Sequence, residues 1–256
     1  MLDYAAFPEQ RQSLIRQMLY EYGRVVCADL SHQMKVSEHT IRRDLHELSK
    51  EGVCKKVYGG AVLQLPQADS YSVRKEHNPD KKSLLARACV GLVKNDSCIF
   101  IDAGTTNFAL AQALPEDIKV TVVTNAPDIA AVLLQHPLAE VIMLGGMIQK
   151  STGGCLGNTA IQQLQGIIFD QAFIGGCAMS PEAGLTGFDF VDCEFKNAAV
   201  RQSSQCVVAL TANKMPAVAR YAVARCDEID ILVVEEALDP ALYNAFTAEG
   251  VKIVAA

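Results

Sequence analysis

The sequence predicts an α/β protein with two parts: a small helical N-terminal domain that ends in a short β-hairpin, and a larger C-terminal α/β domain with a mostly parallel sheet. Three observations predict this arrangement. Apolar residues recur at helical spacing in the first 50 residues, a polar stretch with two prolines follows at 64–80, and short apolar runs then alternate with helix-like segments. Such continuous apolar runs are typical of strands buried on both faces, as in parallel sheets covered by helices.

The composition is that of an ordinary globular protein with room for two domains. Half of the 256 residues are hydrophobic. The formal charge of −6 is unevenly distributed, because residues 1–60 carry nine Lys and Arg against eight Asp and Glu, whereas residues 61–256 carry fourteen against twenty-one. Any contact with DNA is therefore expected in the first 60 residues, although this charge alone is too small to predict one.

Membrane segments, secretion signals and cofactor sites are not indicated. The N-terminus has no basic start followed by an apolar run, and no apolar stretch reaches the roughly 18 residues of a spanning helix. The nine cysteines are odd in number and include no Cys-x-x-Cys pair. We expect a cytoplasmic protein with reduced, mostly buried thiols and no cofactor; a metal or redox site at the cysteines is the minor alternative.

The N-terminal domain is predicted to contain three helices. The first follows Pro8, which suits a first turn, and ends at Gly23. The second covers residues 28–34, and a short turn leads to Ser37, which stands where an N-cap is expected for a third helix that runs to about residue 52. This is the plan of a helix-turn-helix, at about 25–44, whose second helix offers its N-terminal side chains to the major groove of DNA.

The outer face of the third helix and the segment after it carry the candidate DNA contacts. Ile41, Leu45 and Leu48 fall on one face, which leaves the polar side chains between them to look outward. Residues 53–62 form two short extended runs that suit a basic hairpin, or wing. The residues expected to contact DNA are Ser37, His39, Thr40, Arg42, Arg43, Lys55, Lys56 and Tyr58.

The alternative for this domain is a three-helix bundle whose paired arginines are a solvated face. It is the weaker interpretation, because the cap, the arginine pair and the basic hairpin occur within about 25 residues and supply several phosphate donors on one surface. Ser-Glu-His-Thr-Ile-Arg-Arg-Asp-Leu at 37–45 and Lys-Val-Tyr-Gly-Gly-Ala at 56–61 are also similar to the winged helix-turn-helix signature of the DeoR family of bacterial transcriptional regulators. That family more often has Arg and His where this chain has Lys56 and Tyr58.

The domain boundaries follow from these changes of pattern. The winged helix-turn-helix domain is expected at 1–62, a linker with room for a short helix at 63–80, and the α/β domain at 81–256. A helix is expected at 84–93. The expected strands are 98–101, 120–123, 141–144, 172–174, 206–210, 229–234 and 251–254.

Polar residues gather directly after three successive strands of this domain. Asp-Ala-Gly-Thr-Thr-Asn at 102–107 follows the first, Thr-Asn-Ala at 124–126 the second, and Gly145-Gly146 the third. Glycine lets the backbone approach an anion, hydroxyls donate, and the amides of a helix that begins near Phe108 would point the same way. For the first loop alone, a turn with N-capping threonines is about as good an explanation. Three such loops together favour an anion site.

From residue 82 onward the sequence resembles the DeoR sensor domain, which is similar in fold to ribose-phosphate and amino-sugar-phosphate isomerases. The resemblance rests on Lys82, Asp102-x-Gly-Thr-Thr, Thr124-Asn125, Leu144-Gly-Gly, Asp170-x-Ala-Phe-Ile-Gly-Gly176, Gly184-Leu-Thr, Glu194-x-Lys196 and Lys214. It implies a phosphorylated sugar or related metabolite as effector. The residues expected to bind the effector are Lys82, Asp102, Gly104, Thr105, Thr106, Thr124, Asn125, Gly145, Gly146, Lys196 and Lys214.

One segment departs from the family pattern. Where the family usually has Asp-Ser-Ser-Lys, this chain has Thr211-Ala-Asn-Lys214, so the lysine is kept and the carboxylate is absent. The change leaves three outcomes open: a different ligand, a weaker ligand, or none.

Two functions compete on these observations. In the first, a repressor of a carbohydrate-utilisation operon senses a phosphorylated metabolite and shifts the population of operator-binding dimers or tetramers, whose contacts the resemblance places in the sensor domain or linker. In the second, a sugar-phosphate isomerase carries a DNA-binding appendage. Isomerisation needs a carboxylate base, for which Asp102 and the remoter Glu194 are the candidates, and the isomerases' Lys-Gly-Gly-type loop is absent. We therefore expect a regulator and not an enzyme. Redox sensing by cysteine ranks last, since no low-pKa signature is present.

Overall fold

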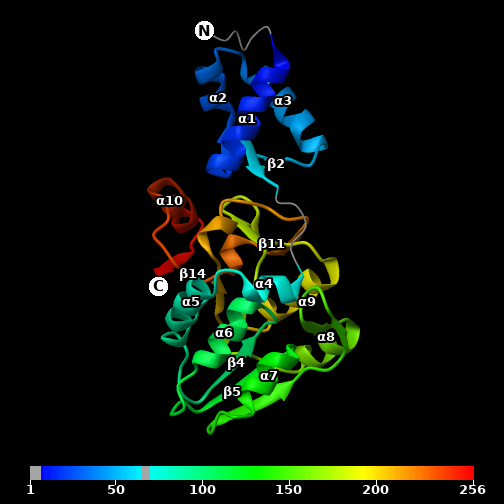
Figure 1. The fold of residues 1–256 in the computed structure, drawn as a ribbon, viewed down its shortest axis with the longest axis vertical. Coiled ribbons are helices and arrows are strands. Elements are labelled where there is room, and N and C mark those ends of the chain that lie inside the picture. Colours follow the sequence, from blue (N-terminus) through cyan, green and yellow to red (C-terminus); the bar gives the residue numbers. More distant parts are fainter. Residues whose placement is uncertain (1–6, 65–69) are drawn as a thin grey trace.

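The structure, a computed structural model, describes residues 7–64 and 70–256. Its N-terminal part is a helical domain with a small antiparallel sheet (Figure 1). The helices are α1 (Pro8–Tyr22), α2 (Cys27–Met34) and α3 (Glu38–Lys50), and the strands are β1 (Arg24–Val26), β2 (Cys54–Val57) and β3 (Gly60–Leu63). The strand order β1-β3-β2 makes β2 and β3 the predicted wing hairpin. A helix-turn-helix with a wing is thus confirmed.

Strand β1 is the one element of this domain that the sequence does not predict. It has only three residues, too few to show an alternating pattern. It pairs with β3, with Arg24 opposite Val62 and Val26 opposite Gly60. The backbones of β1 and β3 approach closely here, because a Cβ atom at Gly60 would lie 2.0 Å from the carbonyl oxygen of Val25. Glycine is therefore required at the start of β3.

A buried ion pair joins α1 to α3 inside this domain. Two nitrogens of the Arg11 guanidinium donate to the carboxylate of Asp44: Nε to Oδ2, and Nη2 to Oδ1 at 3.0 Å. Each of the two side chains is only 4% exposed. Around the pair, Ile15, Leu19 and Ile41 are buried in one apolar cluster. Since either charge alone would be costly to bury, the pair helps to fix how α3 lies against α1.

The C-terminal part is the predicted α/β domain. Its helices are α4 (Tyr71–Glu76), α5 (Pro79–Val90), α6 (Thr105–Ala113), α7 (Pro127–Leu133), α8 (Asn158–Gln165), α9 (Phe190–Arg201) and α10 (Pro240–Ala248). Its main-sheet strands are β4 (Ser97–Ile101), β5 (Val120–Thr124), β6 (Ala139–Met143), β9 (Gln171–Ile174), β12 (Cys206–Ala209), β14 (Ile231–Val234) and β15 (Lys252–Ala255). These seven strands correspond to the seven apolar runs in the sequence.

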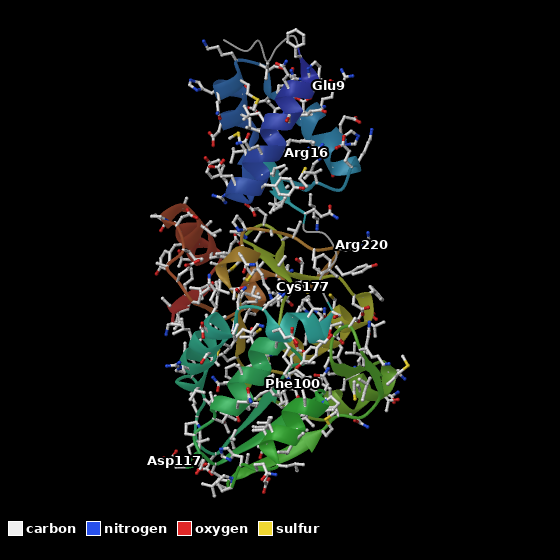
Figure 2. All side chains as sticks on the ribbon, viewed as in Figure 1. Glu9, Arg16, Phe100, Asp117, Cys177 and Arg220 are labelled. Carbon is white, nitrogen blue, oxygen red and sulfur yellow. The ribbon has the colours of Figure 1, made fainter. Side chains whose placement is uncertain are left out.

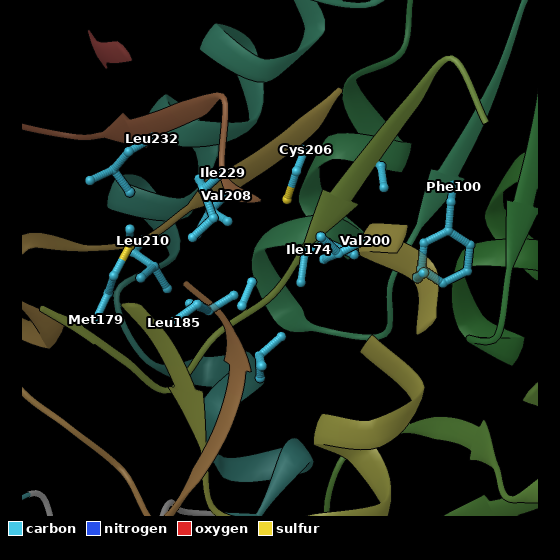
Figure 3. Packing of buried hydrophobic residues seen from close by; sticks show 14 of the residues in the cluster. Phe100, Ile174, Met179, Leu185, Val200, Cys206, Val208, Leu210, Ile229 and Leu232 are labelled. Atoms are coloured by element: carbon cyan, nitrogen blue, oxygen red, sulfur yellow. The ribbon is translucent and has the colours of Figure 1, made fainter. Parts of the chain in front are cut away.

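The main sheet is parallel throughout and is covered on both faces. Its order is β15-β14-β12-β9-β4-β5-β6. One apolar cluster packs α5, α6 and α7 on one face, with Leu85, Leu110 and Ile129 buried. On the other face α8, α9 and α10 pack over Phe100, Val208 and Leu232, shown in Figure 3. The apolar runs are continuous because both sides of each strand are buried.

Two smaller β structures lie outside the main sheet. Strands β7 (Met147–Gln149) and β8 (Gly154–Leu156) form a hairpin, and β10 (Ala178–Ser180), β11 (Gly184–Gly187) and β13 (Tyr221–Ala224) form an antiparallel sheet in the order β10-β11-β13. These strands have three or four residues each, and the sequence does not predict them.

A backbone hydrogen bond and an ion pair join the two domains. The amide of Val218 donates to the carbonyl oxygen of Leu63 at 2.9 Å. Within the N-terminal domain, the amide of Leu63 donates to the carbonyl oxygen of Gly23 at 2.7 Å. Arg24 forms an ion pair with Glu182 at 3.3 Å. Figure 2 shows Arg220 and Cys177 in the part of the α/β domain nearer the N-terminal domain, and Asp117 at the far end.

Within the described ranges, no helix is long and apolar enough to cross a membrane. All nine cysteines are free, and seven of them are buried.

Candidate functional site

The outer face of α3 presents the predicted polar side chains to solvent. Ser37 caps the helix, since its hydroxyl accepts a hydrogen bond from the amide of Thr40 at 3.1 Å. Ile41, Leu45 and Leu48 are buried beneath the helix. Ser37, His39, Arg42 and Arg43 are exposed, and Thr40 is half-buried. The capped N-terminal turn and the arginine pair therefore lie on one accessible face.

The two arginines of this face differ in their contacts. Arg42 forms an i,i+4 ion pair with Glu38 at 2.6 Å. Arg43 makes no hydrogen bond or ion pair with any residue in the described parts of the chain. The guanidinium of Arg43 is consequently free to reach a base edge or a phosphate, whereas Arg42 would first have to leave Glu38.

The wing adds cationic and aromatic side chains beside α3. Lys55 and Lys56 are exposed, and Tyr58 is fully exposed at the turn between β2 and β3. Successive strand residues point to opposite faces, so the two lysines diverge. The pKa of the Cys27 thiol is raised by burial, and the charges of both Arg42 and Lys56 oppose that rise. The charges of Arg42, on α3, and Lys56, on the wing, therefore both act on this thiol.

The α/β domain contains a cavity of about 100 Å³ at the carboxyl ends of the central strands. The loops after β4, β9 and β12 contribute to it. Sheet order reverses between β4 and β9, because β5 and β6 follow β4 on one side while β12 and β14 follow β9 on the other. Ligands in open α/β sheets bind at such a reversal. The residues that line it are Arg74, Ala103, Gly104, Thr105, Thr106, Asn107, Ser151, Thr152, Gly175, Gly176, Cys177, Phe188, Asp189, Asp192, Lys196, Ala209 and Lys214.

Five predicted effector-binding residues line this cavity, namely Gly104, Thr105, Thr106, Lys196 and Lys214. Gly104 precedes the first turn of α6, so amides at this helix start face the cavity side. A sixth predicted residue, Asp102, is fully buried behind the loop, and its Oδ2 accepts a hydrogen bond from the amide of Gly175 at 2.9 Å.

The other predicted residues are not among those that line the cavity. Thr124 and Asn125 are fully buried and support the β4 loop: the Thr124 hydroxyl donates to the carbonyl of Ile101 at 2.7 Å, and Asn125 Oδ1 accepts from the amide of Ala103 at 3.0 Å. Lys82 donates to the carbonyl oxygen of Arg74. Gly145 and Gly146 follow β6, the edge strand, two positions away from β4. Succession along the chain suggested one site, but the sheet places β9 rather than β5 and β6 beside the cavity.

A buried charge cluster forms one wall of the cavity. The ammonium of Lys196 binds Asp192 and lies 3.5 Å from Oδ2 of Asp102. Burial raises the pKa of Asp102 to about 7, although Lys196 acts against this. Burial also lowers the pKa of Lys196, but the two carboxylates raise it above its ordinary value overall. The lysine therefore stays protonated. One oxygen each of Asp102 and Asp192 has no hydrogen-bond partner among the described residues.

Lys214 forms another part of the cavity wall, and its charge is less well balanced than that of Lys196. Its ammonium donates to the carbonyl oxygen of Gly176 at 2.9 Å. Burial lowers its pKa to about 8, and Arg74, Lys196 and Lys82 add to this effect. No carboxylate in the described ranges forms an ion pair with it, and Thr211 stands where the family resemblance places an aspartate. An anion at this position would replace the absent carboxylate.

Several lining residues were not predicted from the sequence. Asp192 lies four residues before Lys196 on α9, a helical spacing that puts both on one face and could have been read as a pair. Asp189 caps α9 by accepting from the amide of Asp192 at 2.9 Å. Arg74 lies on α4, within the predicted linker, and its guanidinium donates to the carbonyl of Ser151 at 3.1 Å. Nothing in the sequence near Arg74 indicates this role.

Comparisons with known proteins match both parts of the chain. A model described as the DeoR-like helix-turn-helix domain matches residues 11–67, and a model of the DeoR C terminal sensor domain matches residues 77–236. The chain is 30% identical to the HTH-type transcriptional regulator GolR of Listeria innocua serovar 6a, over 96% of this chain and 98% of that protein.

Two further relatives are repressors by name. The chain is 27% identical to the HTH-type transcriptional repressor GlcR of Bacillus subtilis, over 97% of this chain and 96% of that protein. It is 28% identical to the glycerol-3-phosphate regulon repressor of Escherichia coli, over 80% of this chain and 82% of that protein. Among solved structures, ribose 5-phosphate isomerase A of Methanocaldococcus jannaschii aligns over 54% of each chain at 17% identity with a TM-score of 0.40.

Proposed function

Since the chain belongs to the DeoR family of transcriptional regulators, we propose that it is a repressor of a carbohydrate-utilisation operon, relieved when a phosphorylated sugar or related metabolite binds the sensor-domain cavity. Double-stranded operator DNA would be its macromolecular partner, and we place it in the cytoplasm with that DNA. We expect it to act as a homodimer or homotetramer, because helix-turn-helix readers commonly bind paired half-sites and its N-terminal charge is small.

The observation that carries the effector proposal is Lys214, a cation in the cavity with no carboxylate ion pair in the described ranges. Its surroundings favour an anion, because the loop at Thr105 and Thr106 supplies hydroxyls and the start of α6 supplies amides. The unpartnered carboxylate oxygen of Asp192, a residue of the cavity wall, is an acceptor that suits a sugar hydroxyl. A ligand with an anionic end and a hydroxyl-bearing end satisfies both.

The operator proposal is supported by the exposed face of α3 and the wing. Arg43 has no hydrogen-bond or ion-pair partner among the described residues, and the charges of Arg42 and Lys56 both act on the pKa of the Cys27 thiol. The proposed contacts on this face are Ser37, His39, Thr40, Arg42, Arg43, Lys55, Lys56 and Tyr58. The position of Arg43 near the start of the helix suits base contact, and the wing lysines suit phosphate contact.

The isomerase alternative receives no support from the relatives, which are named as transcriptional regulators or repressors and align with this chain over 82 to 98% of their length. Its candidate bases also fit poorly. Asp102 is fully buried and held by Gly175 and Lys196, and Glu194 is exposed on α9 and is absent from the cavity wall. A base must reach the substrate proton directly or through one water.

Thermal melting with a panel of phosphorylated compounds tests the effector proposal. The probes are inorganic phosphate, glycerol 3-phosphate, ribose 5-phosphate and 4-phosphoerythronate, each with its unphosphorylated counterpart as control where one exists. A cognate compound at a hundredfold excess over Kd stabilises the native state by about 2.7 kcal/mol. Thr105→Ala should reduce the shift. NMR of the recovered ligand should show it unchanged. No shift with any phosphorylated compound, or steady conversion of one above a buffer control, would contradict the proposal.

A further inference from the structure

We propose that the segment Lys214–Val218 transmits the state of the cavity to the DNA-binding domain, so that a ligand bound at Lys214 changes operator affinity through this segment. The proposal rests on the proposed function and adds the structural route by which the site regulates DNA binding. One short stretch of backbone touches the cavity at one end and the N-terminal domain at the other.

At the cavity end, the charged side chain of Lys214 donates a hydrogen bond across the cavity wall. Lys214 Nζ donates to the carbonyl oxygen of Gly176 at 2.9 Å, and both residues line the cavity. An ammonium has three donors, and a phosphate or carboxylate is a stronger acceptor than a neutral carbonyl. An anion arriving there would compete with Gly176 for Lys214. Binding therefore alters how Lys214 and the Gly176 loop are held together.

At the other end, the segment forms a single β-bridge with the residue that follows β3 of the N-terminal domain. The amide of Val218 donates to the carbonyl oxygen of Leu63, the last residue of β3, and Val218 forms a parallel bridge with Gln64. The amide of Leu63 in turn donates to the carbonyl oxygen of Gly23. The wing hairpin is thus tied through β3 to a residue four positions after Lys214.

The middle of the segment packs on the end of α1. Gly23 caps α1 with φ of +71°, and a Cβ atom there would lie 2.3 Å from the carbonyl oxygen of Pro216. Arg11 of α1 binds Asp44 of α3, which is next to Arg43 in the sequence. A shift of α1 would therefore move this part of α3. The segment therefore contacts both elements that position the operator-binding face.

Gly176, which accepts the hydrogen bond from Lys214, is connected to the N-terminal domain by a second route. Gly176 precedes β10, and the turn between β10 and β11 carries Glu182, which pairs with Arg24 of β1. The hydroxyl oxygen of Thr186 in β11 accepts from the amide of Ala219 at 2.8 Å, which ties the two routes together. Altering the Lys214–Gly176 contact thus changes both attachments of the N-terminal domain. In the competing explanation, effector rearranges subunits and this junction is a passive tether.

The first test needs no ligand. Lys214→Met removes the hydrogen bond to Gly176, and Lys119→Met is the matched control, because Lys119 is an exposed residue paired with Asp96. Operator affinity should change at least about fivefold in Lys214→Met, the lower end of usual coupling factors, and hydrogen exchange at the Val218 and Leu63 amides should change with it. Lys119→Met should match the wild type. A folded Lys214→Met with unchanged affinity and exchange overturns the proposal.

The second test breaks the junction and leaves the cavity residues in place. Gly23→Ala forces the end of α1 away from Pro216. With ribose 5-phosphate and glycerol 3-phosphate as probes, the melting shift should equal that of the wild type, while the effect of the probe on operator affinity falls from about fivefold to below twofold. Full coupling in folded Gly23→Ala overturns the proposal. If neither probe binds the wild type, the effector proposal fails and the first test still decides this one; if one of the two variants does not fold, the other decides it.

Discussion

Lys196 Nζ lies 3.5 Å from Oδ2 of Asp102, and neither side chain is more than 7% exposed. The same ammonium binds Asp192, so a single lysine balances two buried carboxylates in the cavity wall. Breaking a buried charge pair by removing one partner is much more costly than losing a surface pair. The stability of the cavity wall is thus tied to this lysine.

Lys196→Met should therefore destabilise the α/β domain by about 3 to 5 kcal/mol, since Asp102 and Asp192 remain buried without a counter-charge. Urea unfolding followed by circular dichroism measures the loss. Lys119→Met is the control, because the Lys119–Asp96 pair is exposed and its removal should cost much less stability than the removal of Lys196. If the two substitutions lowered stability equally, Lys196 would not be balancing the charges of Asp102 and Asp192.

Arg43→Ala should weaken operator binding by about 1 to 3 kcal/mol if this side chain makes a base contact. The fold should be unaffected, because Arg43 is exposed and has no partner in the described part of the chain. Fluorescence anisotropy with DNA from upstream of the gene, at fixed salt, gives the affinity. Arg87→Ala, which removes an arginine from α5 of the other domain, is the matched control. Undiminished binding by folded Arg43→Ala would rule out this face as the operator contact.

Arg11→Met should destabilise the N-terminal domain by about 3 to 5 kcal/mol, because Asp44 is left buried and charged. Operator binding should fall with it, since Asp44 adjoins Arg43. The double variant Arg11→Met, Asp44→Leu removes both charges and should regain most of the stability. Unfolding midpoints of the single and double variants form the comparison. A double variant no more stable than Arg11→Met would mean that the ion pair is not the source of the loss.

The lowered pKa of Lys214 predicts a specific pH dependence of stability. Folded Lys214 loses its proton near pH 8, whereas the unfolded side chain keeps it until about 10.5. Between these values the unfolded state binds more protons, so the contribution of Lys214 to the free energy of unfolding rises with pH. Subtracting the free energy of unfolding of Lys214→Met from that of the wild type at several pH values isolates this effect. A difference that is flat or falls between about pH 8 and pH 10 would contradict the buried, cationic surroundings of Lys214.

The parts of the fold that repeat a pattern were predictable from the sequence. The capped third helix follows from Ser37 and the spacing of Ile41 and Leu45, and the parallel strands follow from continuous apolar runs. Strands β1, β7 and β10, like the other short strands outside the main sheet, were missed because three or four residues are too few to show a period.

The composition of the cavity was predictable only in part, for a topological reason. The loop at Gly104 and the residue Lys196 could be predicted as ligand contacts from their residue types. The local sequence does not show, however, that β9 lies beside β4 in the sheet. Gly145 and Gly146 were included because they follow the next strands along the chain, and Arg74 was omitted because it lies in the linker. Which loops meet depends on strand order, and strand order depends on long-range pairing.

Operator affinity measured with and without the phosphorylated compound that raises the melting temperature is the most direct test of a sensor joined to a DNA reader. For a repressor relieved by its effector, saturating ligand should weaken operator binding at least about fivefold, and saturating operator should weaken ligand binding by the same factor, because coupling between two sites is reciprocal. Calorimetric titration of the ligand into the free protein and into the protein–DNA complex gives the second factor. A compound that binds the cavity tightly while both factors remain at one would contradict the proposal that this cavity controls the operator-binding face.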